Sequence, residues 1–142
     1  MRIGSTLIAV LLFSFGLAAC AEDESEKPKE KTVTTDSGLT ITELRPGTGA
    51  YPTRTSLVEV HYHGTLADGK VFDSTVDRGE PARFPLNRVI ACWTEGVAMI
   101  REGGKSRLVC PPQIAYGPSG RPPTIPPGAT LTFEVELLKI MR

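Results

Sequence analysis

The clearest helical pattern in the chain lies between residues 89 and 100. Apolar residues recur there at steps of three and four, at Val89, Ile90, Trp93, Val97 and Ile100. This spacing predicts one helix with a single apolar stripe, and Gly103-Gly104 is a typical stop signal behind it. A helix of about eleven residues is too short to be stable alone in water. The rest of the chain must therefore cover its apolar side, with Trp93 between the helix and its cover.

Segments on both sides of this helix alternate between apolar and polar residues, which predicts strands. The expected strands cover residues 37–44, 57–65, 105–110 and 130–140, with shorter extended pieces starting at residue 70 and covering residues 83–86. Asp68-Gly69 is typical of a tight hairpin turn. Residues 113–128 are rich in proline and predict a long loop of the kind that is usually functional. The predicted fold class is α+β, with an antiparallel sheet of five or six strands curled over one short helix.

The first twenty residues have the pattern of an export signal. Arg2 precedes an apolar run, Leu7 to Phe15, that is too short to span a bilayer as a stable helix. Leu17-Ala18-Ala19-Cys20 then resembles the lipobox of bacterial lipoproteins, in which the chain is cut before a cysteine that becomes lipidated. An ordinary signal peptide with an incidental Cys20 is the alternative. Because Ala21 rather than aspartate follows the cysteine, the expected location is the outer membrane, facing the periplasm.

The chain is therefore expected to have three regions. Residues 1–19 form a lipoprotein signal peptide, residues 20–36 a lipidated Cys20 with a flexible charged tether, and residues 37–142 the folded domain. The tether contains many charged and almost no apolar residues, so it can bury too little surface to offset its ordering entropy. It leaves no room for a helical dimerisation module, and the mature protein is expected to be a membrane-anchored monomer.

Charge and motif content exclude several classes of function. The 16 basic and 16 acidic residues cancel, so no basic field favours a nucleic-acid partner. His61 and His63 lie on one face of a predicted strand, but no further ligand pattern accompanies them, and neither a metal nor a cofactor is expected. The sequence has no G-x-S-x-G elbow, phosphate loop or paired carboxylate motif.

Aromatic and apolar residues with few polar neighbours are spread along the whole domain. Core packing is the simplest interpretation of any one of them. However, Asp73 directly follows Phe72, and Tyr116 and Ile125 both lie in the proline-rich loop. An apolar hollow with a few polar groups at its rim is typical of a site for a small molecule or a side chain. The set therefore predicts a binding pocket as well as a core.

Several motifs follow one another along the domain: Val60-His61-Tyr62-His63-Gly64, Asp68-Gly69-Lys70-Val71-Phe72-Asp73-Ser74, Val89-Ile90 with Trp93-Thr94-Glu95-Gly96-Val97, Ala115-Tyr116-Gly117, Ile125-Pro126-Pro127, and Thr130-Leu131-Thr132-Phe133-Glu134-Val135-Glu136-Leu137. Together they resemble the FKBP-type peptidyl-prolyl cis-trans isomerases, in order from about Ser37 to the C-terminus. The resemblance implies a half-barrel sheet wrapped around one helix. It also implies that the domain accelerates rotation about X-Pro bonds, during folding of exported proteins, without covalent catalysis.

The resemblance further implies roles for individual residues. Trp93 is the expected floor under the substrate proline, the Ile90 N–H and the Tyr116 hydroxyl are expected donors to substrate carbonyls, and Asp73 is expected to hold the polar rim by pairing with Arg78. These four residues, Asp73, Tyr116, Ile90 and Trp93, form the predicted catalytic set. The predicted substrate-binding set is Tyr62, Phe72, Arg78, Phe84, Val89, Ile125 and Phe133.

Two positions depart from the family's pattern. Ala82 stands where an aromatic wall residue is frequent, so one side of the pocket is expected to be more open. Arg121 occupies a loop position that is often histidine. Both substitutions are expected to affect affinity and sequence preference rather than the reaction.

The expected partners are proline-containing segments of unfolded or exported proteins and, by resemblance, macrolide immunosuppressant-type ligands. One alternative function is a non-catalytic FKBP-like chaperone or peptide-binding module at the cell envelope. A second is a thiol redox protein, which is disfavoured because Cys92 and Cys110 lack C-x-x-C spacing.

Cys92 and Cys110 are expected to form a disulfide. Lipidation would consume Cys20 and leave an even pair in an oxidising compartment. Cys92 lies at the start of the predicted helix, and Cys110 shares the inner face of its strand with Leu108, the face that should pack on that helix. Two free buried thiols, acting as small apolar residues, are the alternative.

Overall fold

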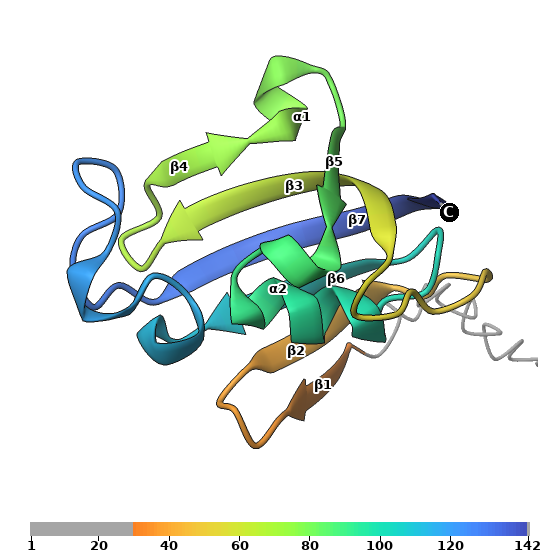
Figure 1. Ribbon diagram of the computed structural model, residues 1–142, viewed down its shortest axis with the longest axis horizontal. Helices are drawn as coiled ribbons and strands as arrows, with labels where there is room; N and C mark the ends of the chain where they lie inside the picture. Colours follow the sequence, from red (N-terminus) through yellow and green to blue (C-terminus); the bar gives the residue numbers. More distant parts are fainter. Residues whose placement is uncertain (1–29, 142) are drawn as a thin grey trace, which may run out of the picture.

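The computed structural model describes residues 30–141, and the predicted signal peptide, Cys20 and most of the predicted tether lie outside these residues. Within this part of the chain, one antiparallel sheet has the order β1-β2-β6-β7-β3-β4, and β5 pairs with the opposite end of β3 from β4 (Figure 1). The strands are β1 (Lys31–Thr34), β2 (Thr40–Arg45), β3 (Leu57–Leu66), β4 (Val71–Ser74), β5 (Ala82–Pro85), β6 (Lys105–Cys110) and β7 (Leu131–Met141). The predicted α+β class with an antiparallel sheet and a short packed helix is confirmed.

The helical segments are all short. They are α1 (Thr75–Arg78), α2 (Ala91–Gly96), and 3₁₀ turns over Leu86–Arg88, Val97–Met99, Pro112–Ile114 and Gly117–Ser119. Residues 30–141 include no helix with the length and apolar character needed to cross a membrane.

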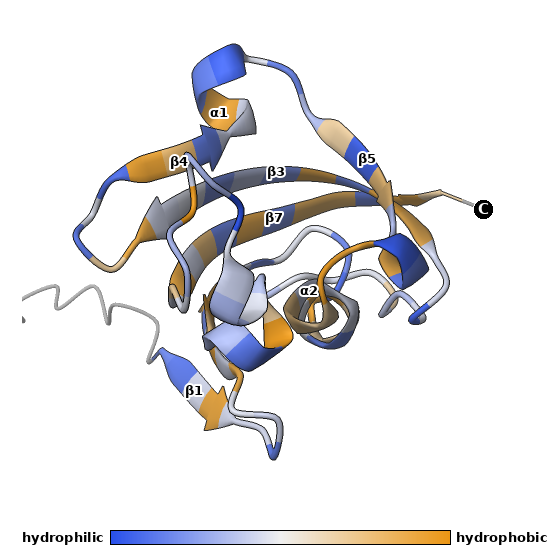
Figure 2. Cartoon of the chain, turned by 60° about the vertical axis from the view of Figure 1, so that its left-hand side comes forward, coloured by the Kyte–Doolittle hydropathy of each residue, from blue (hydrophilic) through white to orange (hydrophobic). Residues whose placement is uncertain are grey.

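The central strands β3 and β7 carry the alternation that the sequence predicts. They pair from Leu57 opposite Met141 to Leu66 opposite Leu131. Val58, Val60 and Tyr62 on β3 are buried, whereas the residues between them are only half-buried. Figure 2 shows this alternation as bands of hydrophobic and hydrophilic colour along both strands. One face of the sheet therefore forms the core and the other faces solvent.

The helix α2 packs on the apolar face of the sheet, as the sequence predicts. Trp93 and Val97 are buried in the core cluster together with Leu108 of β6. Gly96 allows a close approach, because a Cβ atom there would lie 3.0 Å from both methyl groups of Leu108 and 3.2 Å from Leu39. Substitution of this glycine would push the helix away from the sheet.

The predicted helix over residues 89–100 is longer than the observed one. Val89 has φ −115° and ψ 174°, and Ile90 has φ −56° and ψ 149°, both outside the helical region. The α-helix begins at Ala91, and its last turn tightens to 3₁₀ geometry at Val97–Met99. Apolar periodicity overestimated the helix because Val89 and Ile90 are partly buried for another reason: they line a hollow beside α2.

The folded region begins six residues earlier than predicted. Lys31–Thr34, assigned from sequence to the flexible tether, forms the edge strand β1 and gives the sheet seven strands rather than five or six. All four residues are exposed, so hydrogen bonding rather than burial holds the strand. The hydroxyls of Thr32 and Thr42 lie 2.9 Å apart across the pair. A prediction based on apolar alternation does not find such a strand.

The single-turn helix α1 was also not predicted. The Ser74 hydroxyl caps it by accepting a hydrogen bond from the Asp77 N–H at 3.3 Å, and Gly79 ends it with φ +74°. The turn sends the chain from β4 toward β5 and brings Arg78 back beside Asp73.

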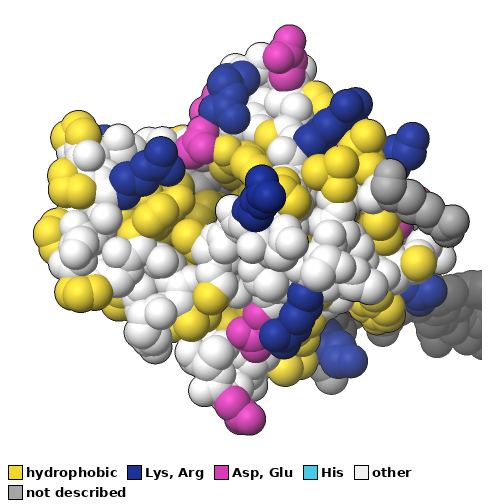
Figure 3. All heavy atoms as spheres, in the orientation of Figure 1, with side chains coloured by type: hydrophobic (Ala, Val, Ile, Leu, Met, Phe, Trp, Pro, Cys, Tyr) yellow, Lys and Arg dark blue, Asp and Glu magenta, His cyan; other side chains and the backbone are white. Residues whose placement is uncertain are grey.

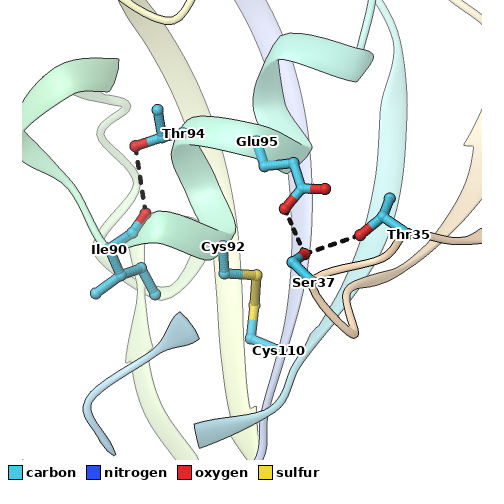
Figure 4. Close-up of a disulfide and its surroundings, with 7 residues drawn as sticks. All are labelled: Thr35, Ser37, Ile90, Cys92, Thr94, Glu95 and Cys110. Carbon is cyan, nitrogen blue, oxygen red and sulfur yellow. Dashed lines mark hydrogen bonds between the residues drawn. A yellow bond between two sulfur atoms is a disulfide. The ribbon is translucent and has the colours of Figure 1, made fainter. Parts of the chain in front are cut away.

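The predicted disulfide is present. Cys92 of α2 and Cys110 of β6 are bonded, with Cα atoms 5.8 Å apart, and both side chains are fully buried (Figure 4). A second link lies nearby, where the Ser37 hydroxyl donates a hydrogen bond to the Glu95 carboxylate at 2.5 Å. Both links fix α2 to the sheet. The burial of both sulfurs also argues against the thiol redox alternative, since redox cysteines are accessible.

Removal of the disulfide should destabilise the fold. The bond closes a loop with a sequence separation of 18, which corresponds to about 3 kcal/mol in the chain-entropy model. The double variant Cys92→Ala, Cys110→Ala is expected to lose free energy of unfolding on this scale in urea titrations. Reductant should lower the wild-type midpoint and leave the variant unchanged. A wild-type midpoint that ignores reductant would show that the bond does not stabilise the protein.

Candidate active site

A hollow of about 150 Å³ opens between α2 and the strands of one end of the sheet. Figure 3 shows hydrophobic side chains gathered in the upper part of this face, with Lys, Arg and acidic side chains around them. The residues that line the hollow come from β3, β4, β5, β7, the start of α2 and the proline-rich loop: Tyr62, Phe72, Asp73, Phe84, Val89, Ile90, Trp93, Tyr116, Arg121 and Phe133. The tertiary structure thus unites side chains that are up to 71 positions apart in sequence.

Trp93 is the centre of the aromatic wall. Its ring meets Tyr62, Phe133 and Phe84 edge to face, with centroid distances of 5.1, 5.3 and 5.5 Å. This geometry is favourable for aromatic pairs. The buried indole Nε1 has no hydrogen-bond partner among residues 30–141. Trp93 therefore contributes a rigid apolar surface rather than a hydrogen bond.

The position of Phe72 depends on a glycine across the hairpin. A Cβ atom on Gly64 of β3 would lie 2.6 Å from Cζ of the Phe72 ring. The absence of a side chain lets the ring lie over the strand and meet Phe133 edge to face at 5.4 Å. Sequence reasoning did not assign this role to Gly64, because its signal is the proximity of a ring that only the folded hairpin provides.

Asp73 is the polar group of the rim, and two partners hold its carboxylate. The Tyr62 hydroxyl donates to one oxygen, and the Arg78 guanidinium pairs with the other. Partial burial alone would raise the pKa of Asp73, but the hydrogen bonds from Tyr62 and Arg78 and the Arg78 charge keep this pKa below its ordinary value of 3.8. Burial, with help from the Asp73 bond, raises the pKa of Tyr62 above 10.0. Asp73 is therefore ionised and Tyr62 neutral near neutral pH.

Besides the Arg121 guanidinium, two lining residues offer hydrogen-bond donors at the hollow. The backbone N–H of Ile90 and the hydroxyl of Tyr116 both belong to lining residues. Neither has a hydrogen-bond acceptor within the part of the chain that the structure describes. Donors without internal acceptors at an apolar site can bind the carbonyl groups of a peptide.

The structure brings together nearly all the residues that the sequence predicts for the site. Two of them do not line the main hollow: Arg78 lies at the rim and pairs with Asp73, and buried Ile125 lines an adjoining hollow. Ala82 packs against the core and does not line the hollow. Arg121, noted from sequence as a departure, lines both hollows.

The two histidines face the opposite side of the sheet. His61 Nδ1 lies 3.0 Å from the Thr75 hydroxyl, and His63 Nδ1 lies 2.9 Å from the Ser74 hydroxyl. Residues 30–141 contain no group of three or more potential metal ligands. Nothing in the hollow resembles an activated nucleophile with its base, so its chemistry is binding by an apolar surface with a few oriented polar groups.

Comparison of the chain with known protein families, curated proteins and solved structures agrees with this geometry. A family model described as FKBP-type peptidyl-prolyl cis-trans isomerase matches residues 49–138. The chain belongs to this family. Among curated proteins it is 49% identical, over 83% of its length, to the FKBP-type 22 kDa peptidyl-prolyl cis-trans isomerase of Escherichia coli. It is 51% identical, over 72% of its length, to FK506-binding protein 1 of Rhizopus delemar, and covers 98% of that protein.

Solved structures show the same fold. The crystal structure of FkpA from Escherichia coli superposes with a TM-score of 0.75 at 49% identity, over 79% of this chain and 53% of that one. A peptidyl-prolyl cis-trans isomerase from Pseudomonas syringae superposes with a TM-score of 0.74 at 40% identity, over 82% of this chain and 86% of that one. The chain spans only 57% of the 22 kDa Escherichia coli relative and 41% of an Aeromonas hydrophila FkpA, at 53% identity.

The Asp73 carboxylate should stabilise the fold only while it is ionised. Because its pKa is lowered in the folded protein, its contribution is present above the unfolded value and is lost as the pH falls through the folded value, below 3.8. The side chain is 40% exposed, so we expect Asp73→Asn to cost under about 1 kcal/mol at about pH 7. In urea unfolding, the difference in free energy of unfolding between the wild type and Asp73→Asn should disappear toward about pH 2.

The control is Glu80→Gln, which removes an exposed carboxylate that has no ion pair among the described residues. Its free energy of unfolding should differ from that of the wild type by an amount that does not change with pH. A difference for Asp73→Asn that persists unchanged at about pH 2 would contradict the role of the ionised carboxylate.

Proposed function

We propose that the protein is a peptidyl-prolyl cis-trans isomerase that binds the proline ring against Trp93. The observation that carries this proposal is the combination of an aromatic hollow with two donors, the Ile90 N–H and the Tyr116 hydroxyl, that have no acceptor within residues 30–141. A proline ring suits the aromatic floor, and the carbonyl groups beside it suit the donors. The names of the Escherichia coli and Aeromonas hydrophila relatives support isomerisation over a non-catalytic chaperone or peptide-binding module.

The reaction needs no nucleophile. Rotation about a peptide bond is opposed by a barrier of about 18–20 kcal/mol because resonance is lost, and X-Pro bonds interconvert in tens to hundreds of seconds without help. A twisted amide has less charge separation than a planar one. Transfer from water to an apolar hollow therefore costs the planar ground state more than the transition state, and this difference accelerates rotation.

Individual side chains have matching roles in this mechanism. Trp93 is the floor, and Tyr62, Phe72 and Phe133 are walls that exclude water. The Ile90 N–H and the Tyr116 hydroxyl hold the carbonyl groups on either side of the rotating bond. Asp73, neutralised by Arg78, orients the Tyr62 ring through its hydroxyl. Phe84, Val89 and Ile125 complete the apolar lining.

The Tyr116 hydroxyl can be tested with little risk to the fold. Tyr116→Phe removes one hydrogen bond to substrate and no hydrogen bond found among residues 30–141. A net contribution of about 0.5–1.5 kcal/mol predicts that kcat/KM for a proline tetrapeptide falls about two- to tenfold. Tyr51→Phe is the matched control, because Tyr51 is 60% exposed and does not line the hollow.

Two results would contradict these proposals. If the wild-type protein at about micromolar concentration left the cis-to-trans rate of the peptide unchanged, the isomerase assignment would be wrong. If Tyr116→Phe and Tyr51→Phe had equal, full activity, the hydroxyl would have no role in binding the substrate.

We further propose that the protein works at the cell envelope on exported clients. The support is the lipobox-like Leu17-Ala18-Ala19-Cys20 segment behind an apolar run and a buried disulfide of the kind that oxidising compartments favour. The mature protein would be a monomer, lipid-anchored to the outer membrane and facing the periplasm. The same hollow would admit macrolide ligands, in line with the name of the Rhizopus delemar relative, FK506-binding protein 1.

The anchor predicts a simple change in fractionation. Cys20→Ser removes the proposed lipidation site, so the protein should move from the membrane pellet to the soluble fraction of cells that express it. The Cys92→Ala, Cys110→Ala variant retains Cys20 and should stay with the membrane. Unchanged membrane association of the Cys20→Ser protein would rule out the lipid anchor.

A further inference from the structure

A second hollow of about 270 Å³ adjoins the proposed proline site. Its lining is Phe72, Asp73, Tyr116, Arg121, Thr124 and Ile125. The first four of these residues also line the proline site. The two hollows therefore share a wall and lie side by side, so a residue next to a proline held against Trp93 is within reach of the second one.

Arg121 is held in place at the boundary of the two hollows. Its Cζ lies 5.9 Å from the centre of the Tyr116 ring, a cation–π distance. Its backbone exchanges two hydrogen bonds with Ile125, of 2.8 and 2.9 Å. Gly120 makes this tight loop possible, because a Cβ atom there would lie 2.5 Å from the Ile125 carbonyl oxygen.

The Arg121 charge is not neutralised by the described part of the chain. Among residues 30–141 no carboxylate forms an ion pair with it. Asp73, the acidic residue in the lining of both hollows, is already paired with Arg78. The second hollow therefore combines an apolar wall with one net positive charge, which complements a side chain that has a short apolar stem and a carboxylate.

We propose that Arg121 is a specificity-determining residue that makes the protein favour an acidic residue, glutamate or aspartate, directly before the proline. This inference rests on the proposed isomerase function. The position before the proline is assigned because the rotating bond joins that residue to the proline ring. A subsite beside the ring that holds this residue fixes one side of the bond while the other rotates. Electrostatic attraction to Arg121 then adds to the apolar contact with Ile125.

The test compares matched peptides by NMR exchange, which measures cis-trans rates without a coupling protease. The substrates carry Glu-Pro or Gln-Pro in the same context, and a third carries Gln-Pro-Glu. Arg121 is exposed, and an ion pair at an exposed site predicts that wild-type kcat/KM is about two- to fivefold higher for Glu-Pro than for Gln-Pro. Arg121→Gln should reduce this ratio to about one, Arg121→Lys should retain part of it, and added salt should weaken it.

Arg101→Gln is the matched control. Arg101 also stacks on a tyrosine, with Cζ 5.5 Å from the Tyr51 ring centre, but lines neither hollow. The ratio of kcat/KM for Glu-Pro to that for Gln-Pro should be the same in Arg101→Gln as in the wild type.

A wild-type ratio of one, or a ratio that Arg121→Gln leaves unchanged, would overturn the proposal. If kcat/KM were raised for the Gln-Pro-Glu peptide, and not for the Glu-Pro peptide, relative to the Gln-Pro peptide, the assigned position would be wrong. No acceleration of the Gln-Pro peptide would instead refute the isomerase function itself.

Discussion

The packing of α2 against the apolar face of the sheet is the constraint on which the rest of the structure depends. A helix of six residues cannot persist alone in water, so tertiary contacts must hold it. The disulfide to β6, the Ser37–Glu95 hydrogen bond and the close approach at Gly96 do so from the sheet side. The Thr94 hydroxyl adds a bond of 2.5 Å to the Leu86 carbonyl ahead of the helix. This fixation sets the position of Trp93, and with it the floor of the hollow.

The same tryptophan belongs to the core and to the hollow, which links stability with the proposed activity. Its buried faces meet aromatic rings from β3, β5 and β7, so the hollow is in effect an unfilled part of the core. A charge facing the aromatic floor would weaken its apolar character. The Asp73 carboxylate on the rim is paired with Tyr62 and Arg78, whereas the Arg121 charge lies at the boundary with the second hollow. A rigid, weakly polar site of this kind favours a less polar transition state without any covalent step.

The strand order also separates β1, where the described chain begins, from the candidate site. β1 lies at one edge of the sheet and β4 at the other, and the hollow draws Phe72 and Asp73 from β4. For an anchored protein, this arrangement leaves the site away from the edge where the described chain begins. The edge strand β1 itself is held by backbone pairing and threonine hydroxyls, with little burial, as suits a boundary between a polar segment and a domain.

The sequence by itself determined the elements whose side chains alternate in character. β6 was found from residue 105 to residue 110, and β3 and β7 to within a residue or two, because burial on one face imposes a period of two. The Cys92–Cys110 pairing was also predictable, since helix and strand faces decided which residues could meet. The set of pocket residues was predicted from the family resemblance carried by the motifs, although no local pattern distinguished them from core.

Tertiary structure alone decided the rest. Val89 and Ile90 continue the apolar spacing of the helix, yet their backbone is not helical. Their side chains line the hollow instead of packing on the sheet. β1 has no apolar face and exists only because β2 offers it backbone partners. The position of the Phe72 ring over Gly64 and the unneutralised charge of Arg121 between two hollows depend on contacts across distant segments. Local periodicity reports which residues prefer burial, whereas the space that remains between buried residues is a property of the packed chain as a whole.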